Sequence, residues 1–435
     1  MDYADAIADL ESRQPERMVP DLSRITELVN LLDHPELTYP SIHVTGTNGK
    51  TTTTRMIEAL ACAHGLSAGA YTSPHLQSVT ERLELCGDPI SEDELGEEYE
   101  RLVPFLREVD GRSEQSVTYF ETLTALAYVW FADKPVGVGV FEVGMGGVWD
   151  ATNLVAGDVA VITPIALDHP ELGPTVRHVA VEKAGIIKAG KTVVAREQPA
   201  EALTVIEARV REMEGQLLLE GRDWELAGRI QGIGAQALSV RGRYGTYEGL
   251  RLPVFGEHTA RNAAAAVVAF EAFLDRKLTQ EAVEDALGGF AAPGRLEVLG
   301  RHPLLVVDGA HNPAGAEALA RAVREAFVAA AERVHLVIAV SSNKDVEGIV
   351  AALAPLADAA YAMRNSSRRS APAEVVETAL VAAGVPTSTH ASVGEALAEA
   401  RVQAQEGDLI LVTGSLYTVA DARRAFAEQL RGTQR

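Results

Sequence analysis

From Ser41 onward, short apolar runs bounded by Gly or Asp alternate with amphipathic segments of helical length, and this alternation constrains the fold strongly. It is typical of a parallel β-sheet covered by helices, because parallel strands need a crossover connection between them. We expect strands at residues 41–45, 136–143 and 158–165, and a helix at 50–64. The sequence therefore predicts a doubly wound α/β core.

The domain organisation follows from changes in this pattern. Residues 217–254 contain short β-like runs that predict a small antiparallel appendage. The segment Ala292-Pro293-Gly294 then interrupts the chain, and a second, shorter α/β series follows it. We place one domain at residues 1–292, including the appendage, and a smaller Rossmann-like domain at residues 293–435.

Composition excludes several classes of partner. The chain has 435 residues, with 61 acidic against 39 basic ones, and the net charge of −22 repels nucleic acid and anionic lipid. No stretch reaches the roughly 18 apolar residues of a membrane span, and the first residues lack the pattern of a signal peptide. Two cysteines are too few for a disulfide framework, which favours a reducing compartment. We expect a cytoplasmic protein with neither nucleic acid nor membrane as partner.

A glycine-rich loop lies where the first apolar strand meets the first amphipathic helix. It reads Gly46-Thr47-Asn48-Gly49-Lys50-Thr51. Its backbone N–H groups and the helix N-terminus suit phosphate oxygens, Lys50 adds a positive charge, and the Thr51 hydroxyl suits Mg²⁺. The spacing departs from the standard GxxxxGK[ST] motif because position 44 is Val. A plain turn with a surface lysine is the alternative, but the strand–loop–helix context favours a phosphate loop.

This loop resembles that of the Mur ligase superfamily, and further blocks resemble the dihydrofolate synthase/folylpolyglutamate synthase family within it. The blocks include Thr72–Leu76, Phe120–Thr124, Phe141–Gly147, Asp150–Asn153, Glu182–Ile186, Pro293–Glu297 and Asp308–Pro313. The resemblance implies that ATP phosphorylates a carboxylate and that the amine of L-glutamate displaces the phosphate. Dihydropteroate is the implied acid, and reduced folates are a second one. The loop residues and Asn262 would bind ATP, and we expect a monomer.

The resemblance also implies two Mg²⁺ sites. Ser73, Glu142 and His169 would hold one ion, and Thr51 together with Glu142 would hold the other. The residues themselves agree with this, because Glu142 and His169 each follow an apolar strand, and parallel strands end at a common edge where ligands bind. For His169 alone, a hydrogen-bonded structural role is the stronger interpretation.

Further catalytic and nucleotide-binding roles come from the resemblance. Lys183 would be carbamylated, although the sequence by itself indicates a lysine on a helix surface. Arg295 would clamp phosphate, a role suited to a planar guanidinium, or form a salt bridge between domains. Asp308 and His311 would contact nucleotide and acyl phosphate, or serve in the helix cap before Pro313. A monovalent cation is also implied.

The substrate site is implied at Arg82, Thr118, Phe120, Asp150 and Ser415. A core aromatic is an equally good interpretation of Phe120. At Val148 the family pattern has Arg, which supports a rival hypothesis: a ligase of the same scaffold that acts on a different acid. A rival from another class is a nucleotide-dependent switch or binding protein. The family blocks that contain Glu142, His169, Lys183 and Arg295 disfavour the switch, because a switch needs no second domain that activates a carboxylate.

Overall fold

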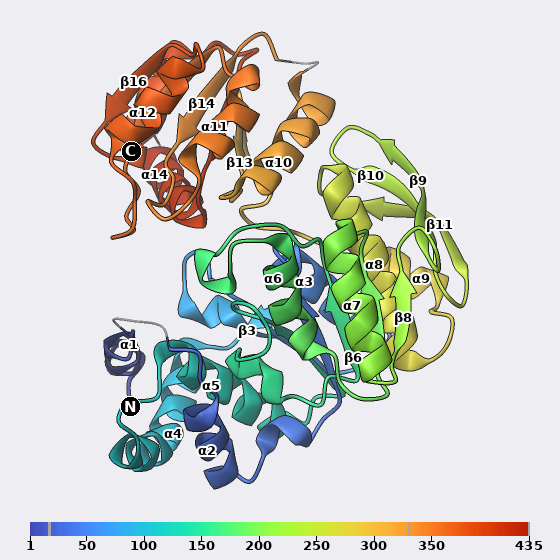
Figure 1. The fold of residues 1–435 in the computed structure, drawn as a ribbon. Helices are drawn as coiled ribbons and strands as arrows, with labels where there is room; N and C mark the ends of the chain where they lie inside the picture. The colour runs from blue at the N-terminus through green and yellow to red at the C-terminus, as the bar shows by residue number, and fades with distance from the viewer. Residues whose placement is uncertain (16–18, 329–330, 434–435) are drawn as a thin grey trace. The chain divides into compact units, whose positions relative to one another are not determined.

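The computed structural model describes residues 1–15, 19–328 and 331–433 (Figure 1). Two compact units make up the chain. The first comprises Met1–Gly228, Leu238–Arg251 and Arg261–Gly289, and the second comprises Arg229–Ala237, Leu252–Ala260 and Phe290–Arg435. Among the described residues, no helix has both the length and the hydropathy of a transmembrane span.

An eight-stranded sheet forms the centre of the first unit, in the order β4-β3-β2-β5-β1-β6-β7-β8. The six strands from β2 to β8 in that order are parallel, and the hairpin β3-β4 extends the sheet antiparallel at one edge. This confirms the predicted doubly wound α/β class. The strands are β1 (Ser41–Thr45), β2 (Ala68–Tyr71), β3 (Leu83–Leu85), β4 (Asp88–Pro89), β5 (Val138–Glu142), β6 (Val159–Ile162), β7 (Thr192–Ala195) and β8 (Gln216–Leu219).

Helices connect and cover these strands. They are α1 (Tyr3–Ser12), α2 (Ser23–Leu31), α3 (Lys50–Ala63), α4 (Glu92–Arg112), α5 (Tyr119–Asp133), α6 (Val176–Lys183), α7 (Ala200–Glu212), α8 (Glu257–Leu274) and α9 (Gln280–Gly288). Short 3₁₀ turns lie at Pro35–Leu37, Val79–Arg82, Ala151–Leu154, Pro170–Leu172 and Ala184–Ile186. A three-stranded sheet in the order β11-β10-β9 contains β9 (Glu225–Gln231), β10 (Gln236–Arg241) and β11 (Thr246–Leu252).

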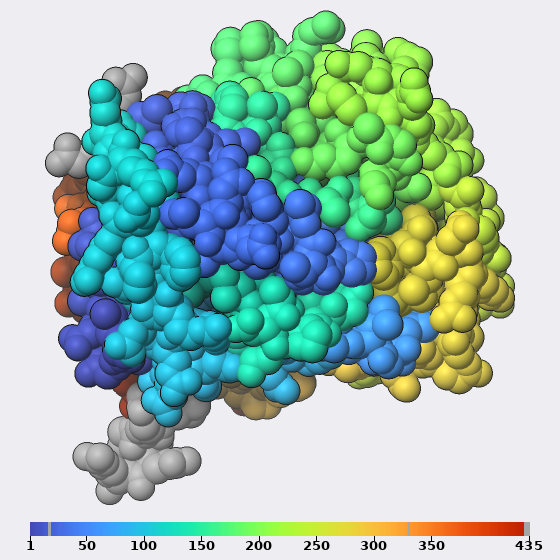
Figure 2. All heavy atoms as spheres, turned by 90° about the horizontal axis from the view of Figure 1, so that it is seen from below, coloured from blue at the N-terminus to red at the C-terminus, as the bar shows by residue number. Residues whose placement is uncertain are grey.

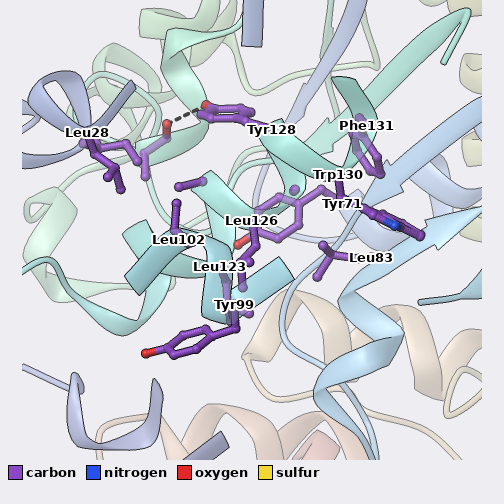
Figure 3. Close-up of a cluster of buried hydrophobic side chains, with 14 of the residues drawn as sticks. Leu28, Tyr71, Leu83, Tyr99, Leu102, Leu123, Leu126, Tyr128, Trp130 and Phe131 are labelled. Carbon is purple, nitrogen blue, oxygen red and sulfur yellow. Dashed lines mark hydrogen bonds between the residues drawn. The ribbon is translucent and has the colours of Figure 1, made fainter. Parts of the chain in front are cut away.

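The largest core of the first unit lies between its N-terminal helices and the sheet. Side chains of α1, α2, α4 and α5 pack there against Tyr71 of β2, Leu83 of β3 and Phe141 of β5 (Figure 3). Seen from below, the blue and cyan N-terminal segments form much of the surface (Figure 2). The start of α5 is fixed by a capping box between Thr118 and Glu121, and Arg24 pairs with the Glu121 carboxylate at 2.9 Å.

A second core of this unit lies under α6 and α7, against β6 and β7. The structure differs here from the expected appendage. Its first run, at residues 216–219, is β8, which pairs in parallel with β7 in the main sheet. Only the later strands β9, β10 and β11 form the separate small sheet. A short apolar run can complete either sheet, so the sequence pattern does not distinguish the two.

The second unit is a six-stranded sheet in the order β12-β13-β17-β14-β15-β16. All neighbours in it are parallel except β12 and β13, as expected for a Rossmann-like arrangement. The strands are β12 (Glu297–Arg301), β13 (Leu304–Val307), β14 (Val334–Ile338), β15 (Ala359–Met363), β16 (Thr387–His390) and β17 (Leu409–Thr413). Its helices are α10 (Pro313–Ala326), α11 (Val346–Leu353), α12 (Ala373–Ala382), α13 (Val393–Gln403) and α14 (Leu416–Thr433), with a 3₁₀ turn at Ala354–Leu356.

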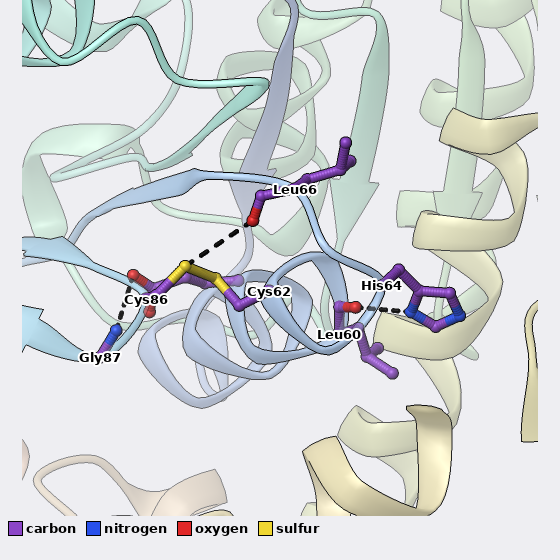
Figure 4. The surroundings of a disulfide bond; sticks show 7 residues. Leu60, Cys62, His64, Leu66, Cys86 and Gly87 are labelled. Atoms are coloured by element: carbon purple, nitrogen blue, oxygen red, sulfur yellow. Dashed lines mark hydrogen bonds between the residues drawn. A yellow bond between two sulfur atoms is a disulfide. The ribbon is translucent and has the colours of Figure 1, made fainter. Parts of the chain in front are cut away.

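The two cysteines form a disulfide that the sequence analysis did not predict. Cys62 near the end of α3 is bonded to Cys86 in the β3-β4 turn, with 5.7 Å between the Cα atoms (Figure 4). The neighbouring Gly87 N–H donates to Glu58 of the same helix at 3.2 Å. The bond therefore ties the helix after the glycine loop to the hairpin at the sheet edge, and the argument for a reducing compartment from cysteine usage loses its force.

Reducing this disulfide should lower the stability of the first unit. Cross-linking residues 24 positions apart restricts the unfolded chain, and a loop of that size corresponds to about 3 kcal/mol. We expect dithiothreitol to lower the midpoint of thermal unfolding by several degrees in the wild type. A Cys62→Ser/Cys86→Ser variant should already have the lower midpoint and should not respond to the reductant. Identical midpoints for all samples would contradict the prediction.

Candidate functional site

The glycine loop joins the end of β1 to the start of α3, and it can form only because two positions lack side chains. At Gly46, which has φ +142°, an added Cβ would lie 1.8 Å from the Thr163 hydroxyl. At Gly49, with φ +89°, it would lie 2.6 Å from the Asn262 amide nitrogen. At both positions the backbone thus approaches neighbouring segments of the same chain more closely than a residue with a Cβ would allow.

Side chains of the loop fix it further. The Thr47 backbone N–H donates to Pro164 at 2.9 Å, and the Thr47 hydroxyl exchanges hydrogen bonds with the backbone of Ala166, both at 2.9 Å. Lys50 folds back over the turn, where its Nζ donates to the carbonyl of Gly46 at 3.2 Å and to that of Thr47 at 3.3 Å. Its ammonium is therefore held at the centre of the loop, as a phosphate-binding lysine must be.

Lys183 is buried beside the same loop, which contradicts the surface position that the bare sequence indicates. Only 4% of Lys183 is exposed, and its Nζ donates to the Gly46 carbonyl at 2.7 Å. Burial, together with the charge of Lys50, lowers the pKa of Lys183 to about 7. The same carbonyl oxygen thus accepts from two lysines, one from α3 and one from α6.

A buried carboxylate adjoins the loop. Glu142, at the end of β5, is 1% exposed and accepts from the Thr51 hydroxyl at 2.9 Å. Its second oxygen accepts from the backbone N–H of Ser73, just after β2, at 3.0 Å. The strands β1, β5 and β2 are neighbours, so three of the predicted metal ligands meet at their carboxyl ends.

The fourth predicted metal ligand, His169, lies in the segment after β6. Its Nε2 is 3.3 Å from the Asp168 carboxylate. Among the described residues, no group of three or more His, Cys, Asp or Glu side chains is placed to hold a metal ion. A metal site at the loop would therefore need the hydroxyls of Thr51 and Ser73 beside Glu142 and His169.

Asn262 of α8 lies on the other side of the turn and is 3% exposed. Its Oδ1 accepts from Nη1 of Arg196 at 2.5 Å. Arg196 also donates through Nε to Glu220 at 3.0 Å. Burial lowers the pKa of Arg196, and the charge of Glu220 opposes that effect. Asn262, one of the predicted ATP-binding residues, thus lies next to Gly49 of the loop.

Arg82, one of the predicted substrate-binding residues, is 7% exposed. Its Nε donates to Nδ1 of His75 at 2.9 Å, and its guanidinium lies over the ring of Tyr119, 5.4 Å from the centroid. Burial, with the charge of Arg82, lowers the pKa of His75 to about 4, so the imidazole is neutral and accepts the bond. Arg82 is therefore linked to the start of α5.

The other substrate candidates of the first unit have clear structural tasks. Thr118 caps α5. Asp150 accepts from the backbone N–H groups of Thr152 and Met145 and caps a 3₁₀ turn, while burial raises its pKa. The Phe120 ring packs so closely on Gly144 that an added Cβ there would lie 2.5 Å from it. Phe120 therefore borders the 144–150 segment, to which Asp150 itself belongs.

Val148 lies in the same segment, at the position where the family pattern has Arg. Its backbone is bonded to Glu182 at 3.1 Å, and the side chain borders Gly185. With 37% of the residue exposed, the position has room for a longer side chain that reaches solvent.

The second unit brings its own candidates to the ends of the parallel neighbours β13 and β17. Asp308 is buried, accepts from the backbone of Leu296 and Ala310, and has its pKa raised by burial against the charge of Arg295. His311 contacts the Gly309 carbonyl through Nδ1 at 2.9 Å. Ser415 follows β17, and its hydroxyl accepts from the backbone of Tyr417 at 3.2 Å.

The helix cap at the start of α10 belongs to Asn312, whose Oδ1 accepts from Gly315 at 2.8 Å, with Pro313 at the first position. Capping therefore explains Asn312, but it does not explain Asp308 or His311.

Sequence analysis missed Arg196 and Glu220. Both directly follow an apolar run, at the ends of β7 and β8. The rule that singled out Glu142 and His169, namely polar residues at the carboxyl ends of parallel strands, also fits these two. Glu220 was missed because the run at β8 was assigned to the appendage, and Arg196 was missed because no strand was predicted at β7.

The chain is similar to known proteins along most of its length. Residues 44–270 match the Mur ligase middle domain, and residues 294–416 match the Mur ligase glutamate ligase domain. The dihydrofolate synthase/folylpolyglutamate synthase of Mycobacterium tuberculosis is 40% identical over 390 residues, which covers 85% of this chain and 80% of that protein. The protein of the same name from Escherichia coli is 34% identical and covers 88% of this chain and 87% of its own length.

Solved structures agree with these relatives. Mycobacterium tuberculosis folylpolyglutamate synthase complexed with ADP superimposes with a TM-score of 0.93 at 36% identity, over 98% of both chains. An Escherichia coli structure, described as FolC in complex with DHPP and ADP, gives a TM-score of 0.88 at 30% identity, over 99% of both chains.

Proposed function

Because the chain belongs to the dihydrofolate synthase/folylpolyglutamate synthase family of Mur ligases, we propose that it joins L-glutamate to dihydropteroate and also extends reduced folates. It is an ATP-dependent acid–amino acid ligase. The acid's carboxylate oxygen attacks the γ-phosphorus of ATP, and ADP leaves. The glutamate amine then attacks the carbonyl carbon, releases phosphate and loses a proton, which leaves an amide.

One observation supports this reaction most directly: the glycine loop holds Lys50 at its centre, next to the Thr51–Glu142 pair. Lys50 neutralises charge that develops during phosphoryl transfer, and the loop N–H groups orient the phosphates. We propose ATP contacts for Gly46, Thr47, Asn48, Gly49, Lys50, Thr51 and Asn262 in the first unit, and for Arg295 and Asp308 in the second. Arg295 and His311 are the proposed catalytic residues of the second unit.

Mg²⁺ fits the donor set at the loop. Glu142 offers a buried carboxylate, Thr51 and Ser73 offer hydroxyls, and His169 offers an imidazole, which together with phosphate oxygens suit a hard divalent cation. When bound, the ion supplies positive charge beside the triphosphate. The hydrogen bond from Thr51 holds the Glu142 carboxylate in place. A monovalent cation stays a prediction of the family resemblance.

The substrate acid is the finer part of the proposal. Arg82, Thr118, Phe120 and Asp150 surround the start of α5 and the 144–150 segment, and we propose that the pterin ring binds there; Ser415 is a further candidate. The proposed compartment is the cytoplasm, where ATP is supplied, and the proposed state is a monomer. A nucleotide switch has no support, since the matched models include a glutamate ligase domain.

Replacing Lys50 by Ala should abolish measurable ATP turnover. The lysine makes only two backbone contacts, so its loss should disturb folding little, whereas a phosphate-neutralising charge contributes several kcal/mol in the transition state. The measurement is ADP release with dihydropteroate and glutamate, together with the circular dichroism spectrum. Lys191→Ala, which removes a surface pair with Asp158, is the matched control and should stay active. Wild-type turnover in Lys50→Ala would refute the loop assignment.

We predict that Lys183 is carbamylated in the active enzyme. Its pKa near 7 leaves much of the amine neutral at physiological pH, and only the neutral amine attacks CO₂, forming the N–C bond as one proton passes to water. The carbamate keeps an N–H for the Gly46 carbonyl. A ¹³C carbamate resonance should appear in bicarbonate-labelled wild type and be absent from Lys183→Ala, whose activity short carboxylic acids should partly restore. A bare ammonium in a nucleotide complex would contradict this.

Val148 provides a test of the substrate acid. If the usual Arg donates charge-assisted hydrogen bonds to the acid, its absence costs about 1.5–3 kcal/mol unless another cation such as Arg82 takes the role. We expect wild type to release ADP with dihydropteroate and glutamate, to act on tetrahydrofolate as well, and to need glutamate in both cases. Val148→Arg should fold, because the position is partly exposed, and should change this activity little.

The informative outcome is the opposite pattern. No activity of wild type on dihydropteroate combined with strong activity of Val148→Arg would reject the proposed acid. It would leave the ligase chemistry intact and favour an acid without a pterin ring.

A further inference from the structure

We infer that Arg196 is a positioning residue for the nucleotide base: it fixes the carboxamide of Asn262 so that the amide Nδ2 donors face the base. This inference rests on the nucleotide site proposed above. The inference concerns recognition of the base and not of the phosphates. It implies that the edge of the base next to Asn262 carries a hydrogen-bond acceptor, such as a ring nitrogen of a purine.

The orientation of the Asn262 amide follows from its partner. Arginine donates hydrogen bonds and accepts none, so the amide atom that faces Nη1 of Arg196 at 2.5 Å must be the oxygen. A Cβ on Gly49 would lie 2.6 Å from the amide nitrogen and 3.0 Å from the amide oxygen, so the whole carboxamide borders the glycine turn, and the bond to Arg196 decides which of its ends carries the donors. Within the described part of the chain, Nδ2 donates to no protein acceptor, although Asn262 is only 3% exposed.

Arg196 is itself held rigidly. It directly follows β7, and its backbone N–H donates to Ile162 of β6 at 2.9 Å. Its Nε donates to Oε2 of Glu220 at 3.0 Å, and the same oxygen accepts from the Glu197 backbone at 2.8 Å. The other oxygen of Glu220 accepts from Nε of Arg261 at 2.7 Å. Both Arg196 and Glu220 are less than a tenth exposed.

The network of Arg196, Glu220 and Arg261 fixes the positions of its own side chains. A buried arginine is costly to desolvate, and a fully satisfied buried network specifies one arrangement of its members. Of the two arginines on Glu220, Arg196 reaches Asn262, whereas Arg261 instead pairs with Glu197 at 2.6 Å. The chain therefore provides a matched pair of residues for a test: Arg196 and Arg261 both bind the Glu220 carboxylate, but only Arg196 of the two contacts the Asn262 amide.

Without Arg196 the amide can turn over and present its oxygen to an acceptor of the base. We expect Arg196→Met to weaken ADP binding about tenfold, the effect of a lost charge-assisted hydrogen bond. Binding of inorganic pyrophosphate, which has no base, should stay within about twofold of wild type. The control Arg261→Met should leave pyrophosphate binding unchanged and weaken ADP binding clearly less than Arg196→Met does, because Arg261 pairs with Glu220 and Glu197 rather than with Asn262. Isothermal titration calorimetry of the full-length protein measures both ligands.

A double-mutant cycle separates positioning from general damage. If Arg196 acts through Asn262, Arg196→Met should cost ADP affinity in wild type and nothing further in an Asn262→Ala background. Additive losses would overturn the inference, as would equal losses of ADP affinity in Arg196→Met and Arg261→Met. If Arg196→Met does not fold, Arg196→Lys replaces it, because one ammonium cannot hold Glu220 and Asn262 as the planar fork does.

Failure of the underlying site gives a different result. If wild type binds neither ADP nor pyrophosphate, or if Lys50→Ala leaves pyrophosphate binding intact, the proposed nucleotide site is wrong. If wild type binds both ligands and Arg196→Met matches it for ADP, only the positioning role is wrong.

Discussion

The carbonyl oxygen of Gly46 is the point on which the first unit's site depends. It accepts hydrogen bonds from Lys50 of α3 and from Lys183 of α6, and thereby links both helices to the end of β1. The turn reaches this position only because Gly46 has no side chain to collide with Thr163. Two cations on one oxygen repel each other, and this repulsion adds to burial in lowering the pKa of Lys183. An anionic ligand at the loop would reduce the repulsion between the Lys50 and Lys183 ammonium groups, so this arrangement favours anion binding.

The parallel sheet explains why the other groups gather there. Thr51, Ser73 and Glu142 meet because β1, β2 and β5 are neighbours that end at one edge. Arg196 and Glu220 follow β7 and β8 at the same edge. Because parallel strands end at a common edge, the sheet brings together both the Thr51–Ser73–Glu142 group and the network that orients Asn262. The same rule operates again in the second unit, where Asp308 and Ser415 follow neighbouring strands.

This rule also defines how far the sequence could lead. Alternating apolar runs and the glycines of the loop predicted β1, α3 and the position of Glu142, because these features are local. The Cys62–Cys86 bond is not local. The cysteines are 24 positions apart in the sequence and belong to no recognisable motif, so they meet only when the hairpin packs against α3. The burial of Lys183 likewise depends on how α6 packs beside the loop. Family resemblance implied a functional role for Lys183, whereas its burial and its bond to the carbonyl that Lys50 also contacts could not be predicted from the sequence.

The charge at that carbonyl determines what the loop can bind. With two ammonium groups, Lys50 and Lys183 would attract a triphosphate without help from any other ion. A carbamate on Lys183 replaces one of these positive charges by a negative one and leaves the pair with no net charge. The triphosphate would then need another cation, and the Glu142 carboxylate with the Thr51 hydroxyl offers oxygen ligands for one. Carbamylation and divalent metal binding, both proposed here, would therefore be coupled by electrostatics: the carbamate would lower the positive charge that repels a metal ion, and the metal ion would restore the positive charge that the triphosphate needs.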